Sequence, residues 1–296
     1  MKKCVYLLLV LILHTACEDV IEVDLSDQET RLVVDGLIRV DTDEFFIPVE
    51  VKLSLSSNFF DENIPTSAES VIIRYEEIEN NVVIFMGSST LAETAPGSGI
   101  YVPDPNFSSD QRIPTSVLDR NLIFTLFVRH QNRLYLAKTP YASAVPINSL
   151  RQDDGSLFNG DETEIVVNFT DDPEQNNYYL FDFDFGEYLV TEDEFFQGQV
   201  FEFSFFYDQR FDPETTINIS ILGADQAFYN YMDLLIEQSG DFQGPFQTPV
   251  TTVRGNVFDI TDLDNIDVFD NVDQPDVFPL GYFAIVQEYK SSITIN

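Results

Sequence analysis

Apolar and polar residues alternate at every second position along much of this chain. In residues 49–55 the residues Val49, Val51, Leu53 and Leu55 alternate with polar side chains, and residues 71–75 follow the same pattern. Residues 122–128 are apolar almost without a break. Alternation predicts strands with one buried face, and a continuous apolar run predicts a strand buried on both faces. We therefore expect about seven short antiparallel strands over residues 30–146, forming a β-sandwich of immunoglobulin-like size.

The second half of the chain continues the pattern with aromatic residues. Phenylalanine occupies alternate positions twice, at Phe181, Phe183 and Phe185 and again at Phe201, Phe203 and Phe205. Isoleucine alternates in the same way over residues 217–221, and the chain closes with two further expected strands, over residues 281–286 and 292–295. Alternate side chains point to the same face of a strand, so each set predicts one apolar face directed into a core. The functional alternative, an aromatic platform for a ligand, would require exposed rings.

One segment has helical spacing instead. Asp225 is a suitable cap, Gly240 a suitable end, and the apolar residues between them recur every three or four positions: Phe228, Tyr231, Met232, Leu235 and Ile236. Residues 147–163 lose the alternation and gain Gly, Asn and Asp, which is typical of a boundary. The chain is thus expected to be all-β, with a sandwich domain over 30–148. A second antiparallel β domain, sandwich or barrel, is expected over 160–296 with one short helix near 225–238.

The first residues predict export. Lys2 and Lys3 precede an apolar run over residues 5–13, and small residues lead to Cys17. This is the pattern of a signal peptide over residues 1–16, and the run is shorter than the ~20 residues that span a bilayer. A cysteine at this position resembles the bacterial lipoprotein signal, in which the thiol receives a diacylglyceryl group, so Cys17 is the expected lipidation site and residues 17–29 an acidic tether. The alternative is a secreted protein that merely retains a cysteine there. Cys4 would leave with the signal peptide, so no intrachain disulfide is expected.

Charge narrows the possible partners. The formal net charge is −36 and only three basic residues, Arg210, Arg254 and Lys290, lie beyond residue 152. Such a chain repels phosphate backbones, which argues against nucleic-acid binding. The acidic surface is explained either by solubility in salt or by attraction to cations.

Calcium is the one cofactor that the sequence suggests. Seven aspartates crowd between residues 259 and 276, namely Asp259, Asp262, Asp264, Asp267, Asp270, Asp273 and Asp276. Closely spaced oxygen ligands suit Ca²⁺, but the segment lacks the glycine and closing glutamate of an EF-hand. A solvated acidic loop explains the segment better, so no metal ligand is assigned.

Candidate catalytic residues are few. Beyond the signal peptide the only histidine is His130, in an expected hairpin turn over residues 130–132, where we expect it to be solvated. One histidine cannot build a zinc cage, and no G-x-S-x-G elbow is present. Carboxylate pairs could hydrolyse glycosidic bonds, yet the sequence does not single out a pair. No catalytic or cofactor-binding residue is therefore assigned, and we expect a protein that is not an enzyme.

Several local motifs together resemble one family. They are Cys17-Glu18-Asp19-Val20-Ile21, residues 32–38 (LVVDGLI), Pro96-Gly97 with Gly99-Ile100-Tyr101, Asp171-Asp172-Pro173 with Asn177-Tyr178-Tyr179, Tyr229-Asn230-Tyr231-Met232, residues 246–250 (FQTPV) and Gly281-Tyr282-Phe283. Their order is similar to that in an uncharacterised family of bacterial outer-membrane lipoproteins, known as a domain of unknown function. Members are often encoded beside TonB-dependent receptors. The resemblance implies no site residue other than Cys17.

The resemblance sets the functional expectation. It implies an outer-membrane lipoprotein that serves, without catalysis, as a binding or accessory component of a TonB-dependent uptake system and takes an unknown small-molecule, peptide or glycan ligand. Glu18 and Asp19 directly after Cys17 resemble the signal for display on the cell surface, although a flexible tether would also explain them. The alternatives are a calcium-stabilised surface adhesion or structural module, and a carboxylate-dependent hydrolase.

Overall fold

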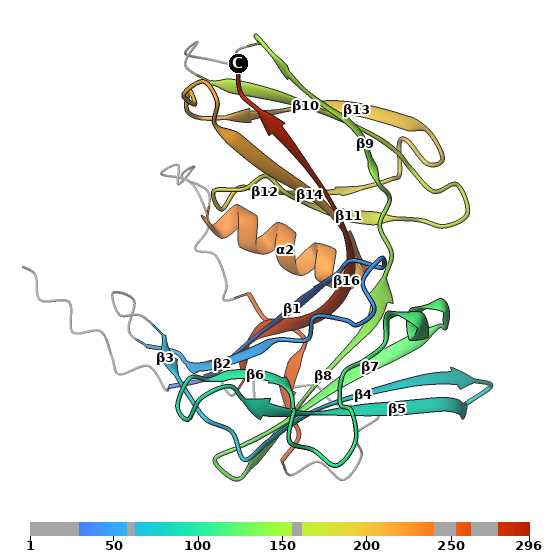
Figure 1. The fold of residues 1–296 in the computed structure, drawn as a ribbon, viewed down its shortest axis with the longest axis vertical. Coiled ribbons are helices and arrows are strands. Elements are labelled where there is room, and N and C mark those ends of the chain that lie inside the picture. Colours follow the sequence, from blue (N-terminus) through green and yellow to red (C-terminus); the bar gives the residue numbers. More distant parts are fainter. Residues whose placement is uncertain (1–29, 58–62, 156–161, 240–252, 262–277) are drawn as a thin grey trace, which may run out of the picture.

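The computed structural model describes residues 30–57, 63–155, 162–239, 253–261 and 278–296, and these residues form an elongated all-β molecule with one α-helix (Figure 1). This confirms the expected fold class. One sheet of 13 strands runs through both halves, and a second sheet has three strands. The signal peptide, Cys17 and the tether lie outside the described residues.

The lower half in Figure 1 contains eight strands from the first part of the chain. They are β1 (Leu32–Val40), β2 (Val51–Leu55), β3 (Ile64–Pro65), β4 (Ser70–Glu79), β5 (Val82–Glu93), β6 (Ile100–Pro103), β7 (Leu122–His130) and β8 (Arg133–Ala142), with a 3-10 turn at Thr115–Asp119. The strand order β1-β2-β6-β5-β4-β7-β8 makes two layers around one core, which includes Val34, Ile73, Phe124 and Phe283. The alternating apolar residues of β2 and β4 and the continuous apolar run of β7 therefore form strands of this core, as the sequence predicts.

The second part of the chain contains the remaining elements. They are β9 (Ile147–Asp153), β10 (Thr163–Thr170), β11 (Tyr178–Asp182), β12 (Tyr188–Glu192), β13 (Val200–Tyr207), β14 (Thr216–Ala224), α2 (Gln226–Ser239), β15 (Val257–Asp259) and β16 (Leu280–Thr294). These elements form the upper half, except β15, which pairs with β8 in the lower half, and β16, which runs through both halves. The small sheet β13-β10-β9 packs on β11, β14 and the end of β16 around an aromatic core. In that core Phe181 and Phe183 are fully buried, and the Phe183 and Phe205 rings stack with centroids 3.8 Å apart.

The helix forms where its spacing predicts. The Phe228 amide donates to Asp225 Oδ1 at 2.7 Å, so Asp225 caps the first turn. Phe228 and Tyr231 pack on Tyr282, on the face of the sheet opposite the aromatic core. The central strands of the upper half are therefore buried on both faces.

Three local expectations need correction. Residues 147–153, expected to belong to a boundary segment, form β9, because they pair with β10 over Asn168 to Glu164. Phe185 is not on a strand: it lies in the turn between β11 and β12 with φ 51° and is 54% exposed. The two strands expected near residues 281–286 and 292–295 are one strand, β16.

β16 joins the two halves. Its first part pairs in parallel with β1, from Val33 beside Leu280 to Val40 beside Gln287. Its second part, from Glu288 to Thr294, pairs antiparallel with β14. Two residues of β16 also pair with β8, so the strand path of the lower half closes on itself. The division of the chain into two domains at residues 148–160 stays a prediction. Besides the chain segment there, β16 connects the two halves through its pairing with β1 and with β14.

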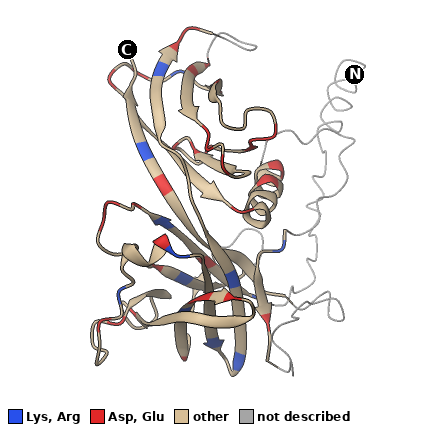
Figure 2. Ribbon diagram, turned by 90° about the vertical axis from the view of Figure 1, so that its right-hand side faces the viewer, with Lys and Arg blue, Asp and Glu red and all other residues tan. Residues whose placement is uncertain are grey.

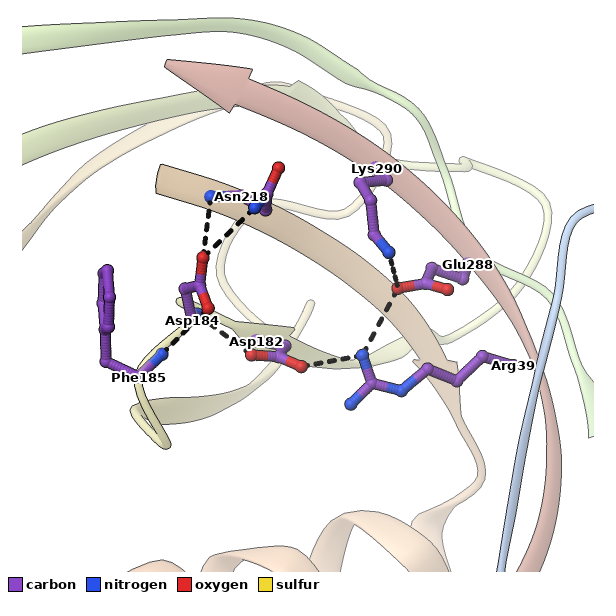
Figure 3. A network of polar contacts seen from close by, with 7 residues as sticks. All are labelled: Arg39, Asp182, Asp184, Phe185, Asn218, Glu288 and Lys290. Atoms are coloured by element: carbon purple, nitrogen blue, oxygen red, sulfur yellow. Dashed lines mark hydrogen bonds and ion pairs between the residues drawn. The ribbon is translucent and has the colours of Figure 1, made fainter. Parts of the chain in front are cut away.

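A charged network reinforces the junction (Figure 3). Arg39 Nη1 lies 2.7 Å from Asp182 Oδ2 and 3.3 Å from Glu288 Oε1, and thus connects β1 with β11 and β16. Burial lowers the pKa of Arg39, but the hydrogen bond to Asp182 and the two carboxylate charges outweigh burial and raise it above its usual value. The arginine is therefore firmly charged and holds the halves together.

Candidate functional site

A pocket of about 350 Å³ opens at the start of β1 and is the best candidate for a binding site. It collects side chains from five separated parts of the chain: Thr30, Arg31 and Leu32; Leu55; His130, Gln131, Arg133 and Tyr135; Asp259; and Phe278 and Pro279. Pairing of β1 with β2 and β16, and of β8 with β7 and β15, brings these parts together. Its volume lies in the range of pockets for small ligands or for a peptide end group.

An aromatic ring flanked by cations forms one wall. The Arg31 guanidinium carbon lies 3.9 Å from the centre of the Phe278 ring, and that of Arg254 lies 4.1 Å from it. Cations over the face of an aromatic ring are attracted by its quadrupole, so the ring orients both guanidinium groups. Phe278 is itself only 8% exposed and is therefore a firm base for them.

A third arginine, Arg133, is held in place by an acidic residue. Arg133 Nη1 donates to Asp259 Oδ2 at 3.0 Å, which ties β8 to β15. Asp259 also accepts from the Thr261 amide at 3.0 Å, so this carboxylate is well supplied with donors. The hydrogen bond and charge of Asp259 raise the pKa of Arg133.

His130 forms part of the floor and corrects an expectation. The turn between β7 and β8 consists of Gln131 and Asn132 alone, both with positive φ, so His130 is still on the strand. Its side chain is 3% exposed, and its Nε2 lies 2.9 Å from the Thr66 hydroxyl. Burial lowers the pKa of His130, although the nearby charge of Glu69 acts in the opposite direction. The imidazole is therefore a buried, neutral group and not a solvated one.

The pocket is electrostatically unusual for this chain. Figure 2 shows acidic residues over α2 and many loops, whereas the basic residues gather mainly in the half that holds the pocket. Arg31 and Arg133 line the pocket and Arg254 stacks on its Phe278 ring, and these three are among the 15 basic residues in a chain of net charge −36. Only Asp259 opposes them among the residues that line the pocket. The arrangement suits an anionic group, which guanidinium groups bind with paired hydrogen bonds.

The sequence of this chain matches a family model over residues 18–291, and the model describes a domain of unknown function, DUF4249. The chain belongs to this family. The matched range contains every described element except the last residues of β16. No curated protein matches the chain.

Among solved structures, the crystal structure of red sea bream transglutaminase matches with 7% identity and a TM-score of 0.22. The match covers 67% of this chain and 29% of the fish enzyme, so the chain spans less than a third of that protein. A similarity this low supports no conclusion about fold or activity.

The other sites considered from the sequence divide into two groups. Cys17 and most of the aspartate-rich segment lie outside the described residues, except Asp259, which is paired with Arg133. In the described part of the chain, no group of three or more His, Cys, Asp or Glu residues could hold a metal ion. The helix of that part is neither long nor apolar enough to cross a membrane.

Among the residues that line the pocket, sequence reasoning singled out only His130 and Asp259. Arg31 and Phe278, and Arg254 which stacks on the Phe278 ring, come from opposite ends of the described chain, and their contact depends on long-range pairing. One weak signal existed, because Arg254 is among only three basic residues beyond residue 152.

Proposed function

We propose that this protein is a lipid-anchored lipoprotein of the outer membrane that faces the cell exterior and binds a ligand as a non-catalytic accessory component of a TonB-dependent uptake system. The observation that carries the binding role is the pocket that places Arg31 and Arg133 beside Phe278 in a strongly acidic chain. The anchoring role rests on Lys2, Lys3, the apolar residues 5–13 and Cys17.

The position of the pocket fits this role. Thr30, at its rim, is thirteen positions after Cys17 in the sequence. At ~3.3–3.6 Å per residue, a fully extended tether would span at most about 45 Å. A ligand in the pocket would therefore be held close to the membrane surface in which an uptake receptor lies.

The chemistry of the pocket favours a ligand that carries a carboxylate. Arg31 and Arg133 supply charged donors, and Phe278 and Leu55 supply apolar surface beside them. Pockets of this kind orient a ligand with a few polar groups and bind its remainder through apolar contact. The Thr66 hydroxyl, which lies 2.9 Å from His130 Nε2, is not among the lining residues, so it holds the imidazole of His130 in place from outside the pocket.

Purification from native outer membranes tests the anchor and the partner. A C-terminally tagged chain is extracted in mild detergent, and co-purifying proteins are identified by mass spectrometry. We expect a TonB-dependent receptor in stoichiometric amount with the wild type, and we expect the Cys17→Ser variant to leave the membrane fraction. Recovery of the lipoprotein alone would refute the accessory role.

A carboxylate panel tests the pocket. Citrate, succinate and N-acetylated dipeptides are screened by the rise in Tm of residues 18–296 produced without the lipid. A binder should lose at least about tenfold in affinity with Arg31→Gln, equivalent to ~1.4 kcal/mol. Lys290→Gln is the matched control, because it removes the same charge from the opposite half of the molecule. Equal loss in both variants would show that only net charge matters.

A further inference from the structure

The β4–β5 hairpin projects from the lower half of the molecule and has an open edge (Figure 1). β5 pairs with β4 from Val82 to Leu91, but with β6 only over Leu91 to Glu93. Within the described residues, the stretch from Val82 to Ser89 therefore has a neighbouring strand on one side only. Its other side presents unpaired backbone amide and carbonyl groups, which can accept a further strand.

The same hairpin concentrates exposed apolar side chains. Ile78, Val82, Val83, Ile84 and Met86 are between 46% and 62% exposed. They account for five of the twelve large hydrophobic residues exposed in the described part of the chain. Single exposed apolar residues are ordinary, but a contiguous group of this kind marks an interaction surface.

The hairpin is held in one shape before any partner binds. Its turn residues Asn80 and Asn81 have φ of 50° and 63°, as a tight two-residue hairpin turn requires. Phe85 packs against Tyr75, with ring centroids 6.2 Å apart, and the Arg120 guanidinium lies 4.3 Å from the Phe85 ring centre. A preformed surface loses less conformational entropy on binding than a flexible one.

Charge selects the partner. Residues 82–89 (VVIFMGSS) contain no charged residue, and they include neither the Lys nor the Pro that commonly protects an edge strand. Of the acids on β4, Glu76 and Glu77 are paired with Arg74 and Arg120, and Glu79 lies at the turn opposite Val82. The edge is thus a neutral area on a chain of net charge −36, where a second copy would add equal repulsion. A different protein with a neutral or basic segment fits the edge better.

We propose that Val82–Ser89 of β5 is the docking edge for the receptor, which adds an extended segment without acidic residues as a further strand. The backbone of β5 would supply the hydrogen bonds. Ile84 and Met86, which lie two positions apart beyond the irregularity in the β4–β5 register, would contact alternate side chains of that segment. This assignment rests on the proposed function, since it names the surface through which the accessory component meets its receptor.

Site-specific photo-crosslinking in native outer membranes tests the assignment. A photoreactive amino acid replaces Ser88, which is exposed on the open strand, and in a control replaces Thr216, which is exposed in the upper half. A crosslink to a TonB-dependent receptor from position 88 and none from position 216 is the expected result. A crosslink from position 88 to a second copy, or to nothing, would overturn the assignment.

Co-purification separates this assignment from the proposed function. The double variant Val83→Lys with Met86→Lys should reduce co-purified receptor at least about tenfold, or ~1.4 kcal/mol in affinity. The control Ile64→Lys changes an exposed residue away from the hairpin and should retain the receptor. Receptor retained by the double variant would overturn the docking edge and leave the accessory role standing. If no receptor co-purifies with the wild type, the accessory role itself is refuted. The crosslinks from position 88 would then show independently whether β5 is a docking edge.

Discussion

The parallel pairing of β1 with β16 depends on one glycine, and replacing it tests the connection between the two halves. Gly281 has φ +89°, a conformation that side chains with a Cβ rarely adopt. A Cβ built on it would lie 1.9 Å from the carbonyl oxygen of Val34 and 2.7 Å from the carbonyl carbon. Both atoms belong to the backbone of β1, so no side-chain rotation relieves the contact.

The cost of Gly281→Ala can be estimated in two parts. The left-handed backbone costs ~1–2 kcal/mol with any Cβ, and forcing an atom into a packed contact adds ~1–3 kcal/mol. The total of about 2–5 kcal/mol is a large part of the ~5–15 kcal/mol that stabilises a typical domain. Gly186→Ala is a matched control, because Gly186 has φ +84° and nothing within 4 Å of its Cβ position. It should show the backbone cost alone.

Urea unfolding of residues 18–296 measures the difference. Residues 18–296 contain 12 of the 13 tyrosines of the chain, which has no tryptophan, so tyrosine fluorescence and far-UV circular dichroism report the transition. We expect Gly281→Ala to lower the free energy of unfolding by at least ~1 kcal/mol more than Gly186→Ala does. Equal losses would refute the close approach of β16 to β1.

Two further predictions concern buried polar groups. Residues 18–296 contain one histidine, and burial keeps the folded-state pKa of His130 below its usual 6.5. As the pH falls through ~6.5 the unfolded chain binds a proton that the folded chain does not, so stability should decline there, and His130→Gln should remove that part of the decline. The imidazole NMR titration checks it, and a folded-state pKa of 6.5 or above would contradict it. Tyr179 donates to Asp171 at 2.5 Å in the core, so Tyr179→Phe should cost ~1–3 kcal/mol in urea unfolding, whereas a loss near zero would show that Asp171 finds another donor.

Local patterns predicted the elements whose causes are local. The alternation in residues 71–75 and 217–221 predicted β4 and β14, because one face of each strand is buried and the other is not. Asp225 and the apolar spacing after it predicted α2, since capping and helix periodicity are both short-range effects. The same reasoning failed for Phe185. Its position continues the Phe alternation, but a tight turn ahead of Gly186 takes it off the strand.

Features that depend on distant pairing could not be predicted. Gly281 indicated the start of a strand, but nothing near it indicates a parallel partner at Val34, almost 250 residues earlier. His130 was placed in a turn because three polar residues follow one another. The actual turn is two residues long, and this leaves His130 on the inward face of β7. One residue more or less in a hairpin turn decides whether a side chain is solvated or buried.

The pocket exists only when the long-range pairing is complete. Phe278 precedes the first residue of β16 and lies between Arg31, which precedes β1, and Arg254, which precedes β15. A ligand that fills the pocket therefore binds the fully paired fold, and at 100 times its Kd it would add ~2.7 kcal/mol to the free energy of unfolding. Loosening β1 from β16 by Gly281→Ala should in turn lower the affinity for the ligand, although Gly281 does not line the pocket. Ligand binding at the pocket and the pairing of β1 with β16 are thus thermodynamically coupled.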